Sequence, residues 1–157
     1  MTYVDRDCST SNGGARPDDS PGEDSALCLE LHTTAGTAVI ATIRTVAADL
    51  AARADFDLDS IDDLRMAVDD LCAMLVRLAA KDAPLRCRFT AWPERIEVAA
   101  DVDVEDETEP PPTRSFGWRV LECLADDVSA VALPRELGQR SRICITVAKN
   151  AATAQQP

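Results

Sequence analysis

The sequence predicts an α+β fold, a two-layer sandwich in which three helices lie on one face of a mostly antiparallel sheet. Two patterns carry this prediction. Apolar residues recur every three or four positions in three segments, and they alternate with polar residues in five others. In chain order these segments run β-α-α-β-β-α-β-β. With 157 residues the chain has the length of one domain with one core.

Three segments have the periodicity of amphipathic helices: residues 37–54, residues 58–80 and a short stretch around 116–124. The central segment, LDSIDDLRMAVDDLCAMLVRLAA, is the longest. Ser60, with Asp63 three places later, matches the spacing of a capping box, so this helix is expected to begin near Ile61. Its apolar stripe consists of Ile61, Leu64, Val68, Leu71, Leu75 and Leu78.

Strands are expected at residues 26–32, 85–91, 96–100, 128–133 and 142–148. The second and third form a hairpin around Trp92-Pro93-Glu94. Residues 101–114 are acidic and then proline-rich, which predicts a loop. Residues 1–25 contain few apolar side chains and are expected to be a disordered tail, residues 26–149 the folded domain, and residues 150–157 a frayed end.

The net charge and the cysteine pattern exclude several classes of function. Sixteen Lys and Arg against 28 Asp and Glu give a net charge of −12, and no basic cluster exists that could bind nucleic acid. No segment has the length of a membrane span, so a cytoplasmic protein is expected. No C-x-x-C pair occurs, so the cysteines are interpreted as reduced core residues rather than zinc ligands. They are Cys8, Cys28, Cys72, Cys87, Cys123 and Cys144.

The helix expected at residues 37–54 has a second, flat face. Ala41, Ala48 and Ala52 surround Arg44 there. A flat surface around one arginine suits protein docking, because arginine is enriched at the centres of interfaces. The alternative is an alanine-rich helix face exposed to solvent.

Two segments carry a resemblance to a known family. FDLDSIDDLRMAVDDLC and SFGWRVLECLADDV resemble motifs of the bacterial anti-sigma factors that are also serine-protein kinases. These proteins belong to the histidine-kinase-like (Bergerat) ATPase superfamily, and the resemblance covers roughly residues 26–149. It implies the fold of that superfamily, a sigma factor and an anti-anti-sigma factor as partners, and pairing of two copies. It also implies that Arg44 contacts the sigma factor.

The resemblance further implies a nucleotide site on the central helix. Asp70 stands where the family has the acid that activates the attacking hydroxyl. Met74, one turn later, replaces the asparagine whose amide oxygen binds Mg²⁺. A thioether is a soft ligand and Mg²⁺ requires oxygen donors, so Met74 cannot replace the asparagine.

The other two motifs of that site are also altered. Asp101 stands at the adenine-binding aspartate of an Asp-x-Gly-x-Gly turn, but Asp103 and Glu105 occupy the glycine positions. Six carboxylates and no base lie between Asp101 and Glu109, which would repel a nucleotide. Of the glycine-rich lid only Gly117 remains. The site is expected to be eroded and to bind no metal and no cofactor; ATP and Mg²⁺ are expected only if it still works.

Three functions remain open from the sequence. The first is an anti-sigma factor that sequesters an alternative sigma factor and so represses transcription, with no or very weak kinase activity. The second is an ATP-dependent kinase that phosphorylates a serine of an anti-anti-sigma factor, with Asp70 as its base. The third is an adaptor on the same fold without a sigma partner.

Overall fold

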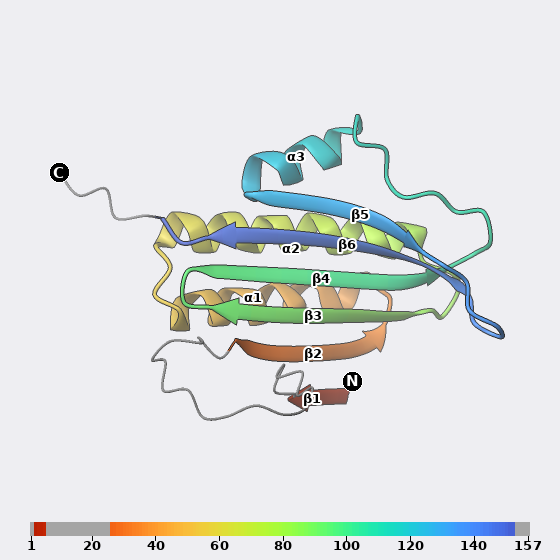
Figure 1. Cartoon of the computed structure of the whole chain (residues 1–157), viewed down its shortest axis with the longest axis horizontal. Helices are drawn as coiled ribbons and strands as arrows, with labels where there is room; N and C mark the ends of the chain where they lie inside the picture. Colours follow the sequence, from red (N-terminus) through yellow and green to blue (C-terminus); the bar gives the residue numbers. More distant parts are fainter. Residues whose placement is uncertain (1, 6–25, 153–157) are drawn as a thin grey trace, which may run out of the picture.

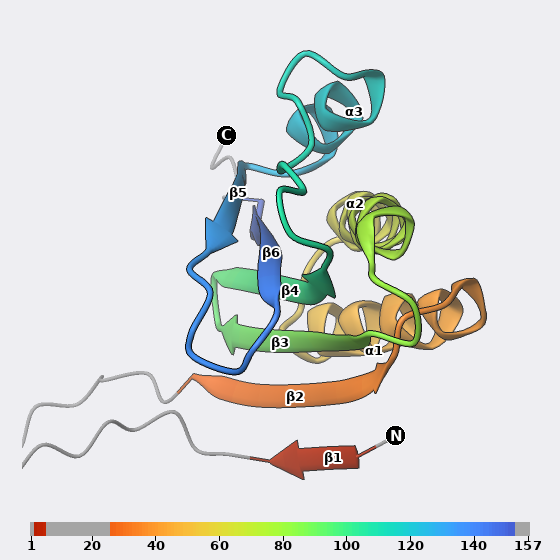
Figure 2. The same cartoon turned by 90° about the vertical axis from the view of Figure 1, so that its right-hand side faces the viewer.

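The computed structural model describes residues 2–5 and 26–152, which form one six-stranded antiparallel sheet with helices on one face (Figures 1 and 2). The strands lie in the order β1-β2-β3-β4-β6-β5. Their bounds are β1 Thr2–Asp5, β2 Leu27–Thr34, β3 Pro84–Trp92, β4 Arg95–Val104, β5 Asp127–Leu133 and β6 Ser141–Asn150. The predicted α+β sandwich is therefore confirmed.

The helices also correspond to the three expected segments. A 3₁₀ turn, η1 (Thr37–Val39), leads into α1 (Ile40–Arg53), and α2 (Leu58–Leu78) and α3 (Phe116–Leu124) follow. The predicted capping box is wrong, because α2 begins one turn earlier than Ile61. Asp57 is its N-cap, and the Asp57 carboxylate accepts hydrogen bonds from both the backbone N–H and the hydroxyl of Ser60.

Three boundaries differ from the sequence prediction, and the end of β4 affects the site. Residues 2–5, expected in a disordered tail, form β1 and pair with β2; the rest of that tail lies outside the described residues. β4 continues to Val104 instead of ending at Ala100, because the alternation persists: Val102 and Val104 are buried, while Asp101 faces the opposite side. β6 likewise extends to Asn150, the first residue of the expected frayed end.

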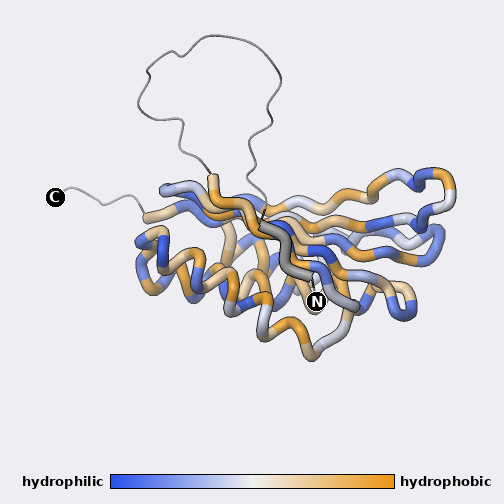
Figure 3. The backbone as a smooth tube through the Cα atoms, turned by 90° about the horizontal axis from the view of Figure 1, so that it is seen from below, coloured by the Kyte–Doolittle hydropathy of each residue, from blue (hydrophilic) through white to orange (hydrophobic). Residues whose placement is uncertain are grey.

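The core fills the space between the helix layer and the inner face of the sheet. Apolar and polar positions alternate along the strands in Figure 3, as a sheet with one covered face requires. The α2 stripe supplies Leu64, Val68, Leu71 and Leu75, all fully buried. Lys149 of β6 links the sheet to α2 and α3. Its ammonium donates a hydrogen bond to the Asp63 carboxylate of α2 and another to the Leu124 carbonyl at the end of α3.

The cysteines do not share one environment. Cys72 and Cys87 are buried free thiols, as predicted, whereas Cys123 is exposed and Cys144 is half-buried. Cys28 is disulfide-bonded, so the expectation of a reduced core cysteine is wrong there. Sequence spacing could not show this, because a disulfide depends on the approach of two distant Cα atoms. Cys8 lies outside the described residues.

Among the helices described, none is long and apolar enough to cross a membrane.

Candidate functional site

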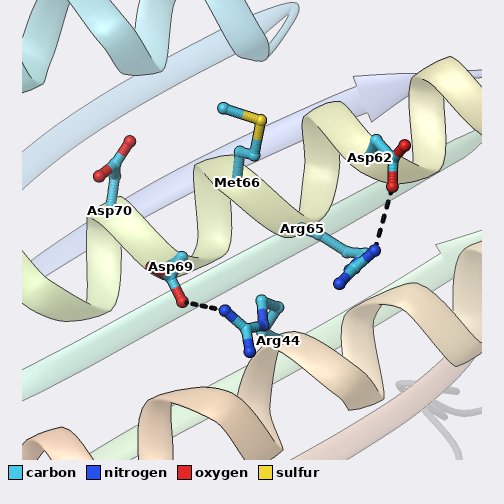
Figure 4. Close-up of a pocket in the computed structure, with 6 residues that line it drawn as sticks. All are labelled: Arg44, Asp62, Arg65, Met66, Asp69 and Asp70. Atoms are coloured by element: carbon cyan, nitrogen blue, oxygen red, sulfur yellow. Dashed lines mark hydrogen bonds and ion pairs between the residues drawn. The ribbon is translucent and has the colours of Figure 1, made fainter.

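A shallow groove runs along the solvent side of α2 where it lies beside α1 (Figure 4). Its volume is about 380 Å³. We call it the α1–α2 groove, and its lining residues are Arg44, Asp62, Arg65, Met66, Asp69 and Asp70. The groove thus contains two residues that the sequence had assigned to different roles, Arg44 to partner binding and Asp70 to catalysis.

Arg44 is held in place by an ion pair across the two helices. Its guanidinium donates to the Asp69 carboxylate at 3.0 Å, and both side chains remain more than a third exposed. Ala41 and Ala52 on the same face of α1 are exposed and Ala48 is half-buried, so small side chains reach solvent around Arg44. No pattern in the sequence pointed to Asp69, because its pairing with Arg44 depends on how α1 and α2 pack.

Asp70 lies on α2 next to Asp69, but its side chain points in a different direction. In Figure 4 it extends away from α1, as does Met66, whereas Asp69 points toward Arg44. Burial raises the pKa of Asp70, the nearby Asp69 charge raises that pKa further, and Arg77 opposes the shift. Within the described part of the chain the Asp70 carboxylate has no hydrogen bond or close ion pair, so only the more distant Arg77 offsets its charge.

Met74 and Gly117 come together, as the family resemblance implied. Met74 is 5% exposed, and its terminal methyl carbon lies 2.6 Å from where a Cβ on Gly117 would stand. The start of α3 therefore packs directly on the Met74 side chain, at the position where the family has a magnesium ligand. A cavity of about 350 Å³ borders this contact, and Pro110, Pro111 and Pro112 form part of its wall.

Asp101 is not part of this region. It lies on the outer face of the sheet, where its carboxylate accepts a hydrogen bond of 2.7 Å from the Arg86 Nε and lies 3.7 Å from Arg142. Its chain neighbours Ala100 and Val102 face the helices instead. The assignment of Asp101 to adenine binding is therefore not supported by its position. The expected strand ended at Ala100, whereas β4 continues through Asp101 and turns its side chain to the outer face.

The acidic segment after β4 is also less isolated than the sequence suggested. Arg140 pairs with Glu105 at 3.1 Å, and Arg135 pairs with Asp106 at 2.9 Å. Arg86 pairs with both Asp101 and Asp103. The bases missing from the segment come from elsewhere in the chain, so the expected repulsion of a nucleotide is overstated. Met74 and the lost glycines are then the features that disfavour a nucleotide site.

The residues present do not fit a magnesium-bound nucleotide. The position of the oxygen ligand is a thioether, and that thioether is packed against the one remaining lid glycine. Among the residues that the structure describes, no group of three or more His, Cys, Asp or Glu is placed to hold a metal ion.

Comparisons with known proteins agree with the resemblance found in the sequence. The chain is 37% identical over 102 residues to the anti-sigma-F factor RsbW of Mycobacterium tuberculosis, from strain H37Rv and from strain CDC 1551 alike. Over this stretch the chain is therefore similar to an anti-sigma factor. The match covers 64% of this chain and 59% of the length of those relatives, so the chain spans less than two thirds of them. No family model matches the sequence.

Proposed function

We propose that this chain is an anti-sigma factor that sequesters an alternative sigma factor by direct protein binding and so represses transcription. The observation that carries the proposal is the 37% identity to the anti-sigma-F factor RsbW over 102 residues. The α1–α2 groove supports it, because the Arg44 side chain is more than a third exposed there, oriented by Asp69 and flanked by small side chains. An oriented arginine in a flat surface is a favourable centre for an interface.

Binding of this kind does not require nucleotide chemistry. Sequestration depends on the shape and charge of a surface, and the α1–α2 groove contains neither Met74 nor Gly117. Met74 replaces the Mg²⁺ ligand that a kinase needs, and its side chain packs against Gly117, the one remaining glycine of the lid. Neither residue lies on the outer side of α1. The chain therefore acts as a binder with no or very weak kinase activity.

The proposal includes further partners and a place of action. An anti-anti-sigma factor competes for the chain and releases the sigma factor, and two copies of the chain pair with each other. These partners act in the bacterial cytoplasm. The second candidate function, an ATP-dependent serine-protein kinase acting on the anti-anti-sigma factor, is favoured by one observation: Asp70 keeps a carboxylate at the position of the family's catalytic acid.

Copurification with the sigma factors of the source bacterium tests the proposal. The full chain, immobilised without nucleotide, is expected to retain one alternative sigma factor in a stoichiometric complex. Arg44→Ala should lose most of this complex. Arg53→Ala is the matched control, since Arg53 lies on the same helix and, among the described residues, pairs only with Asp49 one turn away. Failure of every sigma factor to bind the wild type would contradict the proposal.

A further inference from the structure

The cavity beside the Met74–Gly117 contact lies between the C-terminal end of α2 and the start of α3, and we call it the α2–α3 cavity. The segment that joins β4 to α3 forms one side of it and passes the end of α2 (Figure 2). Its volume of about 350 Å³ is at the lower end of the range of about 300–1,000 Å³ for small-molecule sites. The cavity is therefore large enough for a small organic ligand.

Most of the lining of the α2–α3 cavity is apolar. Helix α2 contributes Met74 and Leu78, the joining segment contributes three consecutive prolines at residues 110–112, and α3 contributes Gly117. Prolines have no backbone N–H to donate, and a polarisable thioether makes favourable contacts with aromatic rings. This wall suits the apolar, preferably aromatic, body of a ligand.

One base in the lining has no partner. Arg77 is exposed, and its guanidinium has no hydrogen bond or ion pair within the described residues. Most other described bases pair with a carboxylate of the chain. Besides Arg77, the described bases without such a pair are Lys81, Arg114 and Arg119. Arg77 is therefore available to bind an anion that comes from outside the chain.

The other charges around the cavity limit what kind of anion fits. A guanidinium binds a carboxylate or sulfonate through paired N–H donors. The first turn of α3 adds partial positive charge, and Ser115 and Gly117 at this turn line the cavity. Glu109 also lines it, so the lining has one base and one acid and no net formal charge. Such a lining favours a ligand with a single negative charge over the several charges of a nucleotide triphosphate.

We propose that the α2–α3 cavity binds a small aromatic monoanion without a metal ion. The aromatic body lies against Met74 and the prolines, and the single carboxylate or sulfonate lies at Arg77. The site that cannot hold a magnesium-bound nucleotide thus becomes a site for a different chemical class. It is independent of sigma factor binding, because the α1–α2 groove shares no lining residue with this cavity.

Fluorescence titration of the full chain with 8-anilinonaphthalene-1-sulfonate tests the inference. This probe combines an aromatic body with one sulfonate, and it fluoresces strongly in apolar surroundings. One equivalent should bind, with a dissociation constant of about 10–100 μM. The matched probe is N-phenyl-1-naphthylamine, which has the same aromatic body and no charge.

Substitution of Arg77 should separate the two probes. Arg77→Gln should weaken binding of the sulfonate probe about fivefold or more and leave the uncharged probe unchanged, because only the sulfonate uses the guanidinium. Arg77→Lys should keep most of the affinity for the sulfonate probe. Arg119→Gln is the matched control, since Arg119 is also exposed and unpaired within the described residues but does not line the cavity.

Glu109 gives a test of opposite sign. Glu109→Gln should strengthen binding of the sulfonate probe about twofold, because it removes a negative charge from the lining. Glu107→Gln is its control, as Glu107 lies in the same segment outside the lining. Circular dichroism and a thermal melt of each variant establish that it is folded before its affinity is compared.

Four outcomes would overturn the inference. They are the absence of saturable binding of the sulfonate probe up to 1 mM, an affinity that Arg77→Gln leaves unchanged, an equal loss for both probes in Arg77→Gln, and displacement of the probe by micromolar Mg-ATP. The last would show that the cavity is still a nucleotide site. None of these outcomes bears on the sigma factor complex, whose retention by the wild type is measured separately, so the inference and the proposed function can fail independently.

Discussion

The α1–α2 groove and the Met74–Gly117 contact lie on the same helix α2 but differ in what they retain. In the groove, Arg44 and Asp69 form an oriented, solvent-exposed pair that a partner can reach. At the Met74–Gly117 contact, a buried thioether occupies the place of a magnesium ligand. Asp70 lines the same groove as Arg44, whereas Met74 lies outside it. The comparison teaches that the change at Met74 leaves the groove between α1 and α2 intact, so that binding of a partner there would not require a working magnesium site.

The largest effect on stability is expected from Met74, because its side chain is buried in the core. Met74→Ala removes a buried side chain between α2 and α3 and should cost about 2–4 kcal/mol of unfolding free energy. Chemical denaturation of the purified variant measures this. Gly117→Ala should destabilise less in the Met74→Ala background than in the wild type, since the crowding methyl is gone. Equal effects in both backgrounds would show that the two residues do not press on each other.

A smaller but functional effect is expected from Arg44. Arg44→Ala should weaken sigma factor binding by more than about 1 kcal/mol, while the melting temperature changes little. The ion pair with Asp69 is partly exposed, and such a pair near the surface contributes about 1 kcal/mol or less to folding. Titration calorimetry and a thermal melt measure the two quantities, with Arg53→Ala as control. A large loss of stability with unchanged affinity would reverse the roles given to the groove.

The smallest effect is expected from Asp70, whose carboxylate has no described partner. Burial raises the pKa of Asp70 in the folded chain above its unfolded value, so the ionised form destabilises the fold. Asp70→Asn should be neutral or stabilising by up to about 1 kcal/mol at pH 7. This advantage should shrink as the pH falls through the raised pKa, where the wild-type carboxyl also becomes neutral.

Thermal melts at pH 7 and pH 5 measure the Asp70 effect. Asp62→Asn is the control, because Asp62 lines the same groove but pairs with Arg65 on its own helix. A clear loss of stability in Asp70→Asn would show a structural partner for the carboxylate. A gain that grows toward low pH would contradict the sign of the pKa shift.

The sequence predicted the layers of the fold and part of the site. Periodicity identified all three helices and five strands, because the burial of one face imposes a regular spacing of apolar residues. It missed β1, since Thr2–Asp5 forms a strand only through its pairing with β2. It also missed the continuation of β4 through Asp101 and Asp103, because acidic residues are typical of loops. In the sheet, Arg86 of the neighbouring strand β3 pairs with both carboxylates.

Within the site, local contacts could be predicted and contacts between elements could not. The relation of Asp70 to Met74 follows from helix geometry, since residues four apart lie on one side. The pairing of Arg44 with Asp69, and of Arg135 with Asp106, joins elements far apart in sequence. The same holds for the Met74–Gly117 contact, whose closeness only the packing of α3 on α2 determines.

Nucleotide binding by the full chain tests the central claim most directly. Titration calorimetry with Mg-ATP should give no saturable heat in the low micromolar range, because the Mg²⁺ ligand is replaced by Met74 and the lid glycines are lost. Met74→Asn alone should not restore binding, since the glycine positions stay occupied by Asp103 and Glu105. A wild-type dissociation constant tighter than about 10 μM, roughly −7 kcal/mol, would contradict the account and favour the kinase.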